Sequence, residues 1–259
     1  MEKKKARGIA PQLVLFFILA ISVPTLLLAL TSIKTTRTAL KNNMKLTSEQ
    51  TLQETQKGFS TYLRTLSQPI DLLTRKDQVK HLEDKGVLED NVTAIQDSLV
   101  ASVKVTDSAV RCYYSTKNGI MIKGWLENVD GKATAKYSYA DGMNKTSQAW
   151  YKDCIGLTSR NGTYANFTNP YTDPETGNKI FTVSQEIKDS SKANYGTVAM
   201  DIEFSAVEEY VQNIGLLNTG FVILADKDGN VIVDSDKNSY VSGNMAGYEF
   251  WKKAQDDVA

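Results

Sequence analysis

The chain has 259 residues, of which 41% are hydrophobic and 23% charged, and its 30 basic and 30 acidic side chains balance to a net charge of zero. This composition excludes a wholly disordered chain, which would be poor in apolar residues and strongly charged. It also argues against a nucleic-acid-binding domain, which is normally basic. Two cysteines are too few for a disulfide scaffold. A single histidine excludes a multi-histidine metal site and leaves little room for a Ser-His-Asp triad.

The charges are distributed unevenly along the chain. Residues 1–33 carry four basic side chains and one acidic, a net charge of +3. Residues 34–82 carry nine and four, a net charge of +5, whereas residues 83–259 carry 17 and 25, a net charge of −8. Three charge signatures indicate three environments.

An uncharged segment near the start predicts a membrane anchor. No residue from Gly8 to Ile33 is charged, and the apolar core of this segment is Leu13–Leu30. A membrane-spanning helix needs about 20 mostly apolar residues, so we expect a basic cytoplasmic tail at 1–11 and a transmembrane helix at 12–33. The basic residues before the span place the rest of the chain outside the cytoplasm by the positive-inside rule. A cleaved signal peptide is the alternative, but its apolar region would run about 7–15 residues.

The next segment has the pattern of a long helix. Apolar or small residues recur every three or four positions over 34–76, which marks one face of a helix. We expect a continuous stalk helix whose Thr-rich stripe packs against the same helix of a second copy in a homodimer. The alternative is two shorter helices, because Pro69 is a position at which the helix could kink or end.

The following region, 77–204, switches from helical periodicity to short runs of strand formers separated by turn residues. The expected elements are a helix at 86–102, a hairpin with strands at 108–116 and 120–127, a short helical stretch at 149–157, and strands at 179–187 and 195–204. The predicted fold class is therefore α+β, dominated by an antiparallel sheet.

A second sheet unit is expected near the end of the chain. A linker helix is predicted at 205–218, followed by a hairpin whose strands, "TGFVILAD" and "VIVDSD", flank the turn "KDGN". About 40 residues do not normally bury a core of their own. Residues 219–259 are therefore expected to be an incomplete unit.

In this order, these landmarks resemble the extracytoplasmic double Cache (dCache) sensor of bacterial chemoreceptors and related kinases. The most specific segments are "WYKDC" at 150–154, "NPYTDPETG" at 169–177 and "YGTVAMDI" at 195–202. The resemblance implies a membrane-distal, PAS-like Cache domain at 77–204 that binds a ligand, and the start of a membrane-proximal Cache unit at 219–259.

The resemblance also implies where the ligand binds. In members that bind amino acids, an arginine two residues before a Trp-Tyr pair holds the ligand carboxylate together with the tryptophan. A later Tyr-x-Asp and a further aspartate at the end of the last strand hold the ammonium group. The matching residues in this chain are Trp150, Tyr151, Tyr171, Asp173 and Asp201.

The chain departs from that pattern at two positions. Gln148 stands at the position of the arginine, and Met143 lies near the place of a family tyrosine, for which Tyr139 is a candidate substitute. Glutamine can hydrogen-bond a carboxylate, but it supplies no charge. Three ligand classes therefore remain open: an amino acid whose carboxylate meets neutral donors, an amine without a carboxylate, and an unrelated small molecule.

The matched residues have a physical rationale of their own. An ammonium group gains from charge-assisted hydrogen bonds to carboxylates and from aromatic faces, by about 0.5–2 kcal/mol when it is desolvated. Two carboxylates that converge without a cation repel each other, so such a pair favours a positive guest.

Each candidate residue also has a simpler interpretation. Trp150 and Tyr151 could be core aromatics where a helix packs on the sheet, and Asp173 could cap a turn. Asp201 is harder to explain structurally, because it lies in an apolar strand. Cys112 and Cys154 are either a disulfide or two small buried side chains.

These observations predict the sensor module of a transmembrane chemoreceptor, a methyl-accepting chemotaxis protein, with a small amino acid or amine as its partner. The input module of a histidine kinase or a diguanylate cyclase is the alternative, because these proteins share the architecture. A membrane-anchored enzyme or a surface protein is less favoured. No catalytic residue, metal site, cofactor or nucleic-acid partner is expected, and cytoplasmic partners would depend on an output domain that the sequence lacks.

Overall fold

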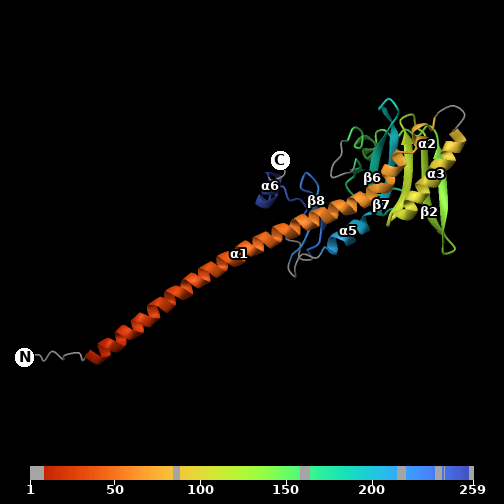
Figure 1. Cartoon of the computed structure of the whole chain (residues 1–259). Coiled ribbons are helices and arrows are strands. Elements are labelled where there is room, and N and C mark those ends of the chain that lie inside the picture. Colours follow the sequence, from red (N-terminus) through yellow and green to blue (C-terminus); the bar gives the residue numbers. More distant parts are fainter. Residues whose placement is uncertain are drawn as a thin grey trace, which may run out of the picture. The chain divides into compact units, whose positions relative to one another are not determined.

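A computed structural model describes residues 9–83, 88–157, 164–214, 220–236, 241 and 243–256. The chain divides into two units, residues 1–56 and residues 57–259 (Figure 1). The first unit is helical where it is described, and the second contains an antiparallel sheet with helices. The α+β fold class predicted from the sequence is therefore confirmed.

The first helix, α1, runs without a break over Ile9–Thr74, a length of 66 residues (Figure 1). The alternative of two shorter helices is therefore excluded, and Pro69 lies inside the helix. From Leu13 onward, α1 is long and apolar enough to cross a membrane, by length and composition. Its last turns are stabilised by the burial of Leu66, Ile70 and Leu73 in the core of the second unit.

Two further helices follow α1 in the second unit. They are α2, Asp77–Lys80, and α3, Leu88–Val105, which corresponds to the helix predicted at 86–102. Residues 86 and 87 of that prediction lie outside the described residues. Ile95, Leu99 and Val103 of α3 lie four positions apart and are buried, so the helix packs on the sheet through one face.

The sheet has seven antiparallel strands in the order β3-β2-β1-β7-β6-β4, with β5 paired to β6. The strands are β1 Ala109–Thr116, β2 Met121–Val129, β3 Lys132–Ala140, β4 Asn166–Phe167, β5 Tyr171–Thr172, β6 Lys179–Lys188 and β7 Asn194–Glu203. The predicted hairpin at 108–127 is β1 and β2, and the predicted last two strands are β6 and β7.

The edge strand β3 was not predicted. It pairs with β2 in the register Val129↔Lys132, which leaves Asp130 and Gly131 as a two-residue turn. Both turn residues have positive φ, 51° and 78°, as a type I′ hairpin turn requires. The Asp-Gly pair was the signal in the sequence, because it is a strong marker of such a turn.

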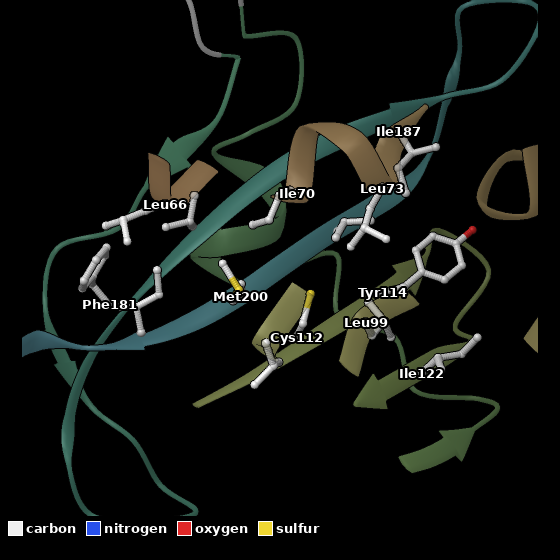
Figure 2. Packing of buried hydrophobic residues seen from close by; sticks show 14 of the residues in the cluster. Leu66, Ile70, Leu73, Leu99, Cys112, Tyr114, Ile122, Phe181, Ile187 and Met200 are labelled. Carbon is white, nitrogen blue, oxygen red and sulfur yellow. The ribbon is translucent and has the colours of Figure 1, made fainter. Parts of the chain in front are cut away.

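The two faces of the sheet have different characters, because side chains alternate along each strand. On one face Cys112, Tyr114 and Met200 pack against α1 and α3, and Figure 2 shows them with Ile70 and Leu73 of α1. On the other face, Tyr113 and Ala199 belong to a smaller cluster together with Met121, Trp150 and Tyr151. This second face also carries the candidate site.

The central strands β1 and β7 approach each other closely at Gly196. A Cβ atom added at Gly196 would overlap the backbone carbonyl oxygen of Ser115. We expect Gly196→Ala to lower the free energy of unfolding by about 1–3 kcal/mol, the usual cost of overpacking a core. Chemical denaturation would measure the loss, and Gly247→Ala is the matched control because a Cβ there meets open space. Equal effects of the two substitutions would contradict this prediction.

The second face is completed by α4, Ala149–Lys152, which is shorter than the helical stretch predicted at 149–157. The linker helix predicted at 205–218 is α5, Phe204–Gln212, and residues 215–218 lie outside the described residues. The predicted second hairpin is formed by β8, Ile223–Ala225, and β9, Val231–Asp234. A final helix, α6, Glu249–Asp256, was not predicted.

Candidate ligand-binding site

A pocket of about 1090 Å³ opens on the second face of the sheet. Its walls are side chains of β1, β2 and β7, the start of α4, the segment 166–175 and the turn between β8 and β9. Of the residues predicted to bind the ligand, the structure brings five together in the lining of this pocket: Gln148, Trp150, Tyr171, Asp173 and Asp201.

Tyr151 does not line this pocket. It is buried beside Trp150, with the ring centroids 5.8 Å apart, and its hydroxyl donates to Asn194 Oδ1 at 3.2 Å. This position agrees with the simpler interpretation of Tyr151 as a core aromatic. Trp150 is also packed, edge-to-face on Tyr113 at 4.9 Å, but it retains contact with the pocket.

One end of the pocket is formed by an ion-pair cluster centred on Arg111, a residue that was not predicted from the sequence. The Arg111 guanidinium donates from Nε to Asp201 Oδ2 at 2.7 Å, from Nη2 to Asp173 Oδ1 at 2.6 Å, and from Nη1 to Glu175 Oε2 at 2.9 Å. Lys123 Nζ donates to the other oxygen of Glu175 at 2.6 Å. Three carboxylates and two cations therefore meet at one end of the pocket.

Strand pairing explains why these side chains meet. Arg111 on β1 pairs with Asp201 on β7, and Asp201 pairs with Thr182 on β6. Residues opposite each other on neighbouring strands point to the same face. The three side chains therefore form a row across the centre of the sheet, and the turn after β5 brings Asp173 and Glu175 to the same place.

Arg111 had a signal in the sequence. It lies in the run "AVRCYY", alternating with Tyr113 on one face, while Cys112 and Tyr114 face the helices. A charged residue within a buried strand is unusual unless it is paired. Asp201 carries the same signal in β7, but only the register between β1 and β7 shows that the two residues are partners.

Asp201 is almost fully buried, with 2% of the residue exposed. Besides the bond from Arg111, its Oδ1 accepts hydrogen bonds from the hydroxyls of Thr182 at 2.7 Å and Tyr113 at 2.9 Å. Tyr171 lies next to Thr182, with 2.7 Å between their hydroxyl oxygens. Burial raises the pKa of Asp201, and the charge of Arg111 and the hydroxyl donors oppose this rise.

Asp173 is fully buried and has two roles. Its Oδ1 accepts from the backbone amide of Glu175 at 3.1 Å and its Oδ2 from the hydroxyl of Thr176 at 2.6 Å, so it does cap the turn. It also pairs with Arg111 at the base of the pocket. In the structure Asp173 therefore both caps the turn and lines the pocket.

Acid should weaken the fold through Asp173. Burial raises the pKa of this carboxyl, but the hydrogen bonds from Arg111, Thr176 and the amide of Glu175 outweigh burial and lower it to about 2 from 3.8. A group whose pKa is lower in the folded state stabilises the protein above its unfolded pKa and loses that contribution as the pH falls through the folded pKa. Its contribution should therefore disappear between about pH 4 and pH 2.

Thermal unfolding of the wild type and of Asp173→Asn across this pH range would measure the effect. The melting temperature of the wild type should exceed that of the variant at neutral pH, and the two should converge in acid. A difference that stays constant down to pH values near 2 would contradict this assignment of the low pKa.

Gln148 lies at the start of α4, as its N-cap residue, and is exposed. Its side chain makes no capping hydrogen bond with the helix. Met143 also lines the pocket, whereas Tyr139, the candidate substitute for the family tyrosine, is outside the lining. Lys145, three residues before Gln148, lines the pocket as well and forms no ion pair within the described part of the chain.

The two cysteines are both buried and free. Cys112 belongs to the core on the helix-covered face of the sheet. Cys154 approaches Thr197 on the opposite face, at 3.5 Å. The interpretation as two buried side chains is therefore confirmed, and the disulfide is excluded by their positions on opposite faces.

A comparison with protein families decides the identity of the fold. The Cache domain family dCache_1 matches residues 32–256. The chain belongs to the Cache domain family. This agrees with the resemblance stated from the sequence, and with the expectation of a sensor domain in place of an enzyme. Within the described residues, no group of three or more His, Cys, Asp or Glu side chains is arranged to hold a metal ion.

Curated relatives of this Cache protein are chemotaxis proteins of Bacillus subtilis (strain 168). It is 33% identical over 97 residues to the methyl-accepting chemotaxis protein McpC, covering 38% of this chain and 14% of McpC. It is 21% identical over 243 residues to the methyl-accepting chemotaxis protein McpB, covering 94% of this chain and 33% of McpB. The chain therefore spans no more than a third of the length of these relatives.

Solved structures of the same fold come from the Campylobacter jejuni chemoreceptor Tlp3. The ligand-binding domain of Tlp3 in complex with L-valine is 15% identical, with a TM-score of 0.52, and the match covers 79% of this chain and 73% of that chain. The sensory domain of Tlp3 with isoleucine bound is 14% identical, with the same TM-score and coverage. At this identity the likeness concerns the fold alone.

Proposed function

We propose that this Cache protein is the extracytoplasmic ligand-sensing module of a methyl-accepting chemotaxis protein, and that it binds a small ammonium-bearing ligand in the pocket described above. One observation supports an ammonium-bearing ligand. Asp173 and Asp201 come from separate elements and converge within 2.7 Å of a single cationic group at the base of a pocket that Trp150 and Tyr171 also line.

The physical chemistry of that arrangement favours a cation. Both carboxylates are buried, and two buried carboxylates need a positive partner close by. Arg111 is that partner in the structure, which supports the view that the geometry can hold a nitrogen cation. The hydroxyl of Tyr171 and the ring of Trp150 would line the same space.

Gln148 offers the carboxylate group of an amino acid ligand a neutral hydrogen-bond donor but no positive charge. If Gln148 faces the ligand carboxylate, Gln148→Arg should raise the affinity for amino acids about tenfold, because a cationic fork would replace a neutral donor. Calorimetric titration of both proteins would measure the change. Unchanged affinity would remove Gln148 from the proposed site.

A ligand screen tests the function. The full chain, purified in detergent, would be screened by thermal shift with the 20 standard L-amino acids and the amines that share their side chains. A specific ligand at about 100 times its Kd should stabilise the protein by about 2.7 kcal/mol. Absence of any shift in a well-folded sample would contradict the proposed ligand class. The Tlp3 structures with L-valine and with isoleucine make these two amino acids reasonable first probes.

The membrane setting is part of the proposal. We place the tail at 1–11 in the cytoplasm, the span at 12–33 in the cell membrane and the sensor body outside, because the basic residues precede the apolar segment. Beyond the span, α1 leaves Leu40, Met44 and Leu52 exposed. These residues and the threonines between them would form the homodimer contact.

The division into domains and the output also remain proposals. We assign 34–76 to the stalk, 77–204 to the membrane-distal Cache domain, 205–218 to a linker and 219–259 to the start of the membrane-proximal Cache unit. The chemotaxis relatives favour a chemoreceptor over a histidine kinase or a diguanylate cyclase. A second span and a long coiled coil encoded downstream of this sequence would support that choice.

A further inference from the structure

Arg111 occupies the place that the ligand ammonium group would need. All three nitrogen atoms of its guanidinium donate to carboxylates, at 2.6–2.9 Å. Its own side chain is 11% exposed, while the side chains of Asp173 and Asp201 behind it are 0% and 2% exposed. The guanidinium is therefore more accessible to a guest in the pocket than either carboxylate.

Most acceptor positions of the two aspartates are already used by groups of the protein. Asp201 Oδ1 already accepts from Tyr113 and Thr182, and Asp201 Oδ2 from Arg111. Asp173 Oδ1 accepts from Arg111 and from the amide of Glu175. An ammonium group placed beside the guanidinium would also be repelled by a like charge. An ammonium group that takes over the contacts of Arg111 with both aspartates therefore requires the guanidinium to move away.

We propose that Arg111 is a built-in occupant of the ammonium subsite, and that ligand binding exchanges this guanidinium for the ligand's ammonium group. The inference rests on the proposed function. Under this proposal Arg111 is a specificity-determining residue. Its guanidinium competes with the ammonium group of every ligand. Once displaced, the guanidinium remains in the pocket as a cation that has lost Asp173 and Asp201 as partners.

The exchange also selects the ligand class. A displaced guanidinium that loses its carboxylates is costly in a partly buried pocket unless another anion meets it. An amino acid brings a carboxylate with its ammonium group, so it returns a partner to Arg111, whereas an amine brings none. The pocket should therefore prefer amino acids to amines, although it lacks an arginine at position 148.

The first experiment tests the occupied subsite without any knowledge of the natural ligand. In the full chain carrying Arg111→Ala, the vacated subsite should bind methylammonium, which should raise the melting temperature relative to sodium chloride at the same ionic strength. The wild type should show no such difference. If Arg111→Ala does not fold, Arg111→Gln provides the same test, because glutamine keeps a neutral donor beside Asp201.

The outcomes separate the inference from the proposed function. Equal responses of variant and wild type to methylammonium would overturn the inference, even if an amino acid from the screen binds. Stabilisation of the variant alone would support the inference, even if no member of the screen binds the wild type and the proposed ligand class fails.

The second experiment tests selection between amino acids and amines. Calorimetric titration would compare L-valine or the best binder of the screen with the amine of the same side chain. In the wild type the amino acid should bind more tightly by about tenfold or more, and in Arg111→Gln this ratio should fall towards one, because the charged partner of the carboxylate is gone.

Lys145 is the matched control, because it lines the same pocket but makes no ion pair among the described residues. If Lys145→Gln abolishes the preference and Arg111→Gln keeps it, the carboxylate partner is Lys145 and the selection assigned to Arg111 is overturned. The reverse result would support it.

Discussion

Substitution of Asp201 by asparagine should abolish high-affinity ligand binding while the sheet remains folded. The change preserves size but removes the charge that the ligand ammonium group would need. Loss of one partner of a buried, hydrogen-bonded charge pair costs about 2–5 kcal/mol, which corresponds to a loss of affinity of at least about 30-fold. Calorimetric titration with the best binder of the screen would measure it, and circular dichroism would verify the fold.

Asp153→Asn is the control for Asp201→Asn. Asp153 lines the same pocket but is exposed, and none of the ion pairs in the base of the pocket includes it. Because exposed charges are screened by water, its substitution should change affinity by less than about fivefold. Similar losses in both variants would indicate a general effect of pocket charge in place of a specific contact.

Substitution of Ile70 by alanine should cause one of the largest losses of stability available in the chain. Ile70 is fully buried between α1 and the sheet, among side chains that include Cys112 and Met200 (Figure 2). Such a truncation costs about 2–5 kcal/mol, because it removes buried apolar groups and leaves a cavity. Chemical denaturation of the full chain in detergent would measure the difference.

Leu72→Ala tests whether the effect of Ile70→Ala comes from packing or from helix propensity. Leu72 lies two residues further along α1 and is 58% exposed. Its substitution should change stability by no more than about 0.5 kcal/mol. A small effect of Ile70→Ala, or an equal effect of Leu72→Ala, would contradict the docking of the end of α1 on the sheet.

Much of the fold could be predicted, because local patterns carry most of its information. The helical stripe of α1 and the runs of strand formers in β1, β6 and β7 are local signals, and the structure has these elements. Pro69 did not break the helix, because Leu66, Ile70 and Leu73 are held in the core on both sides of it. This stabilisation comes from tertiary packing, which the local sequence around Pro69 does not show.

The site was predictable only in part. Asp201, Asp173, Trp150 and Tyr171 could be placed in the pocket by resemblance, and the structure brings them together. Arg111 could not, because its role depends on the register that sets β1 against β7 and on a turn 62 residues away. Pairing across a sheet is a long-range property. An arginine in a buried strand therefore indicates that a charged partner exists, but the local sequence does not identify that partner.

Arg111 also changes the charge balance that is expected of the site. The sequence suggested two carboxylates without a cationic partner, whereas in the structure the guanidinium of Arg111 pairs with both of them. The two aspartates would pair either with Arg111 or with the ligand, which defines two alternative states of the pocket. A ligand shifts the equilibrium between two such states only through its differential affinity for them. A receptor of this kind could signal through the exchange itself.

The most direct test is a crystal structure of the sensor body with the best binder of the screen. We expect the ligand nitrogen to lie within about 3 Å of carboxylate oxygens of both Asp173 and Asp201, and the Arg111 guanidinium to have left that position. A ligand bound elsewhere, or in the pocket without a contact to either aspartate, would contradict the proposed binding site.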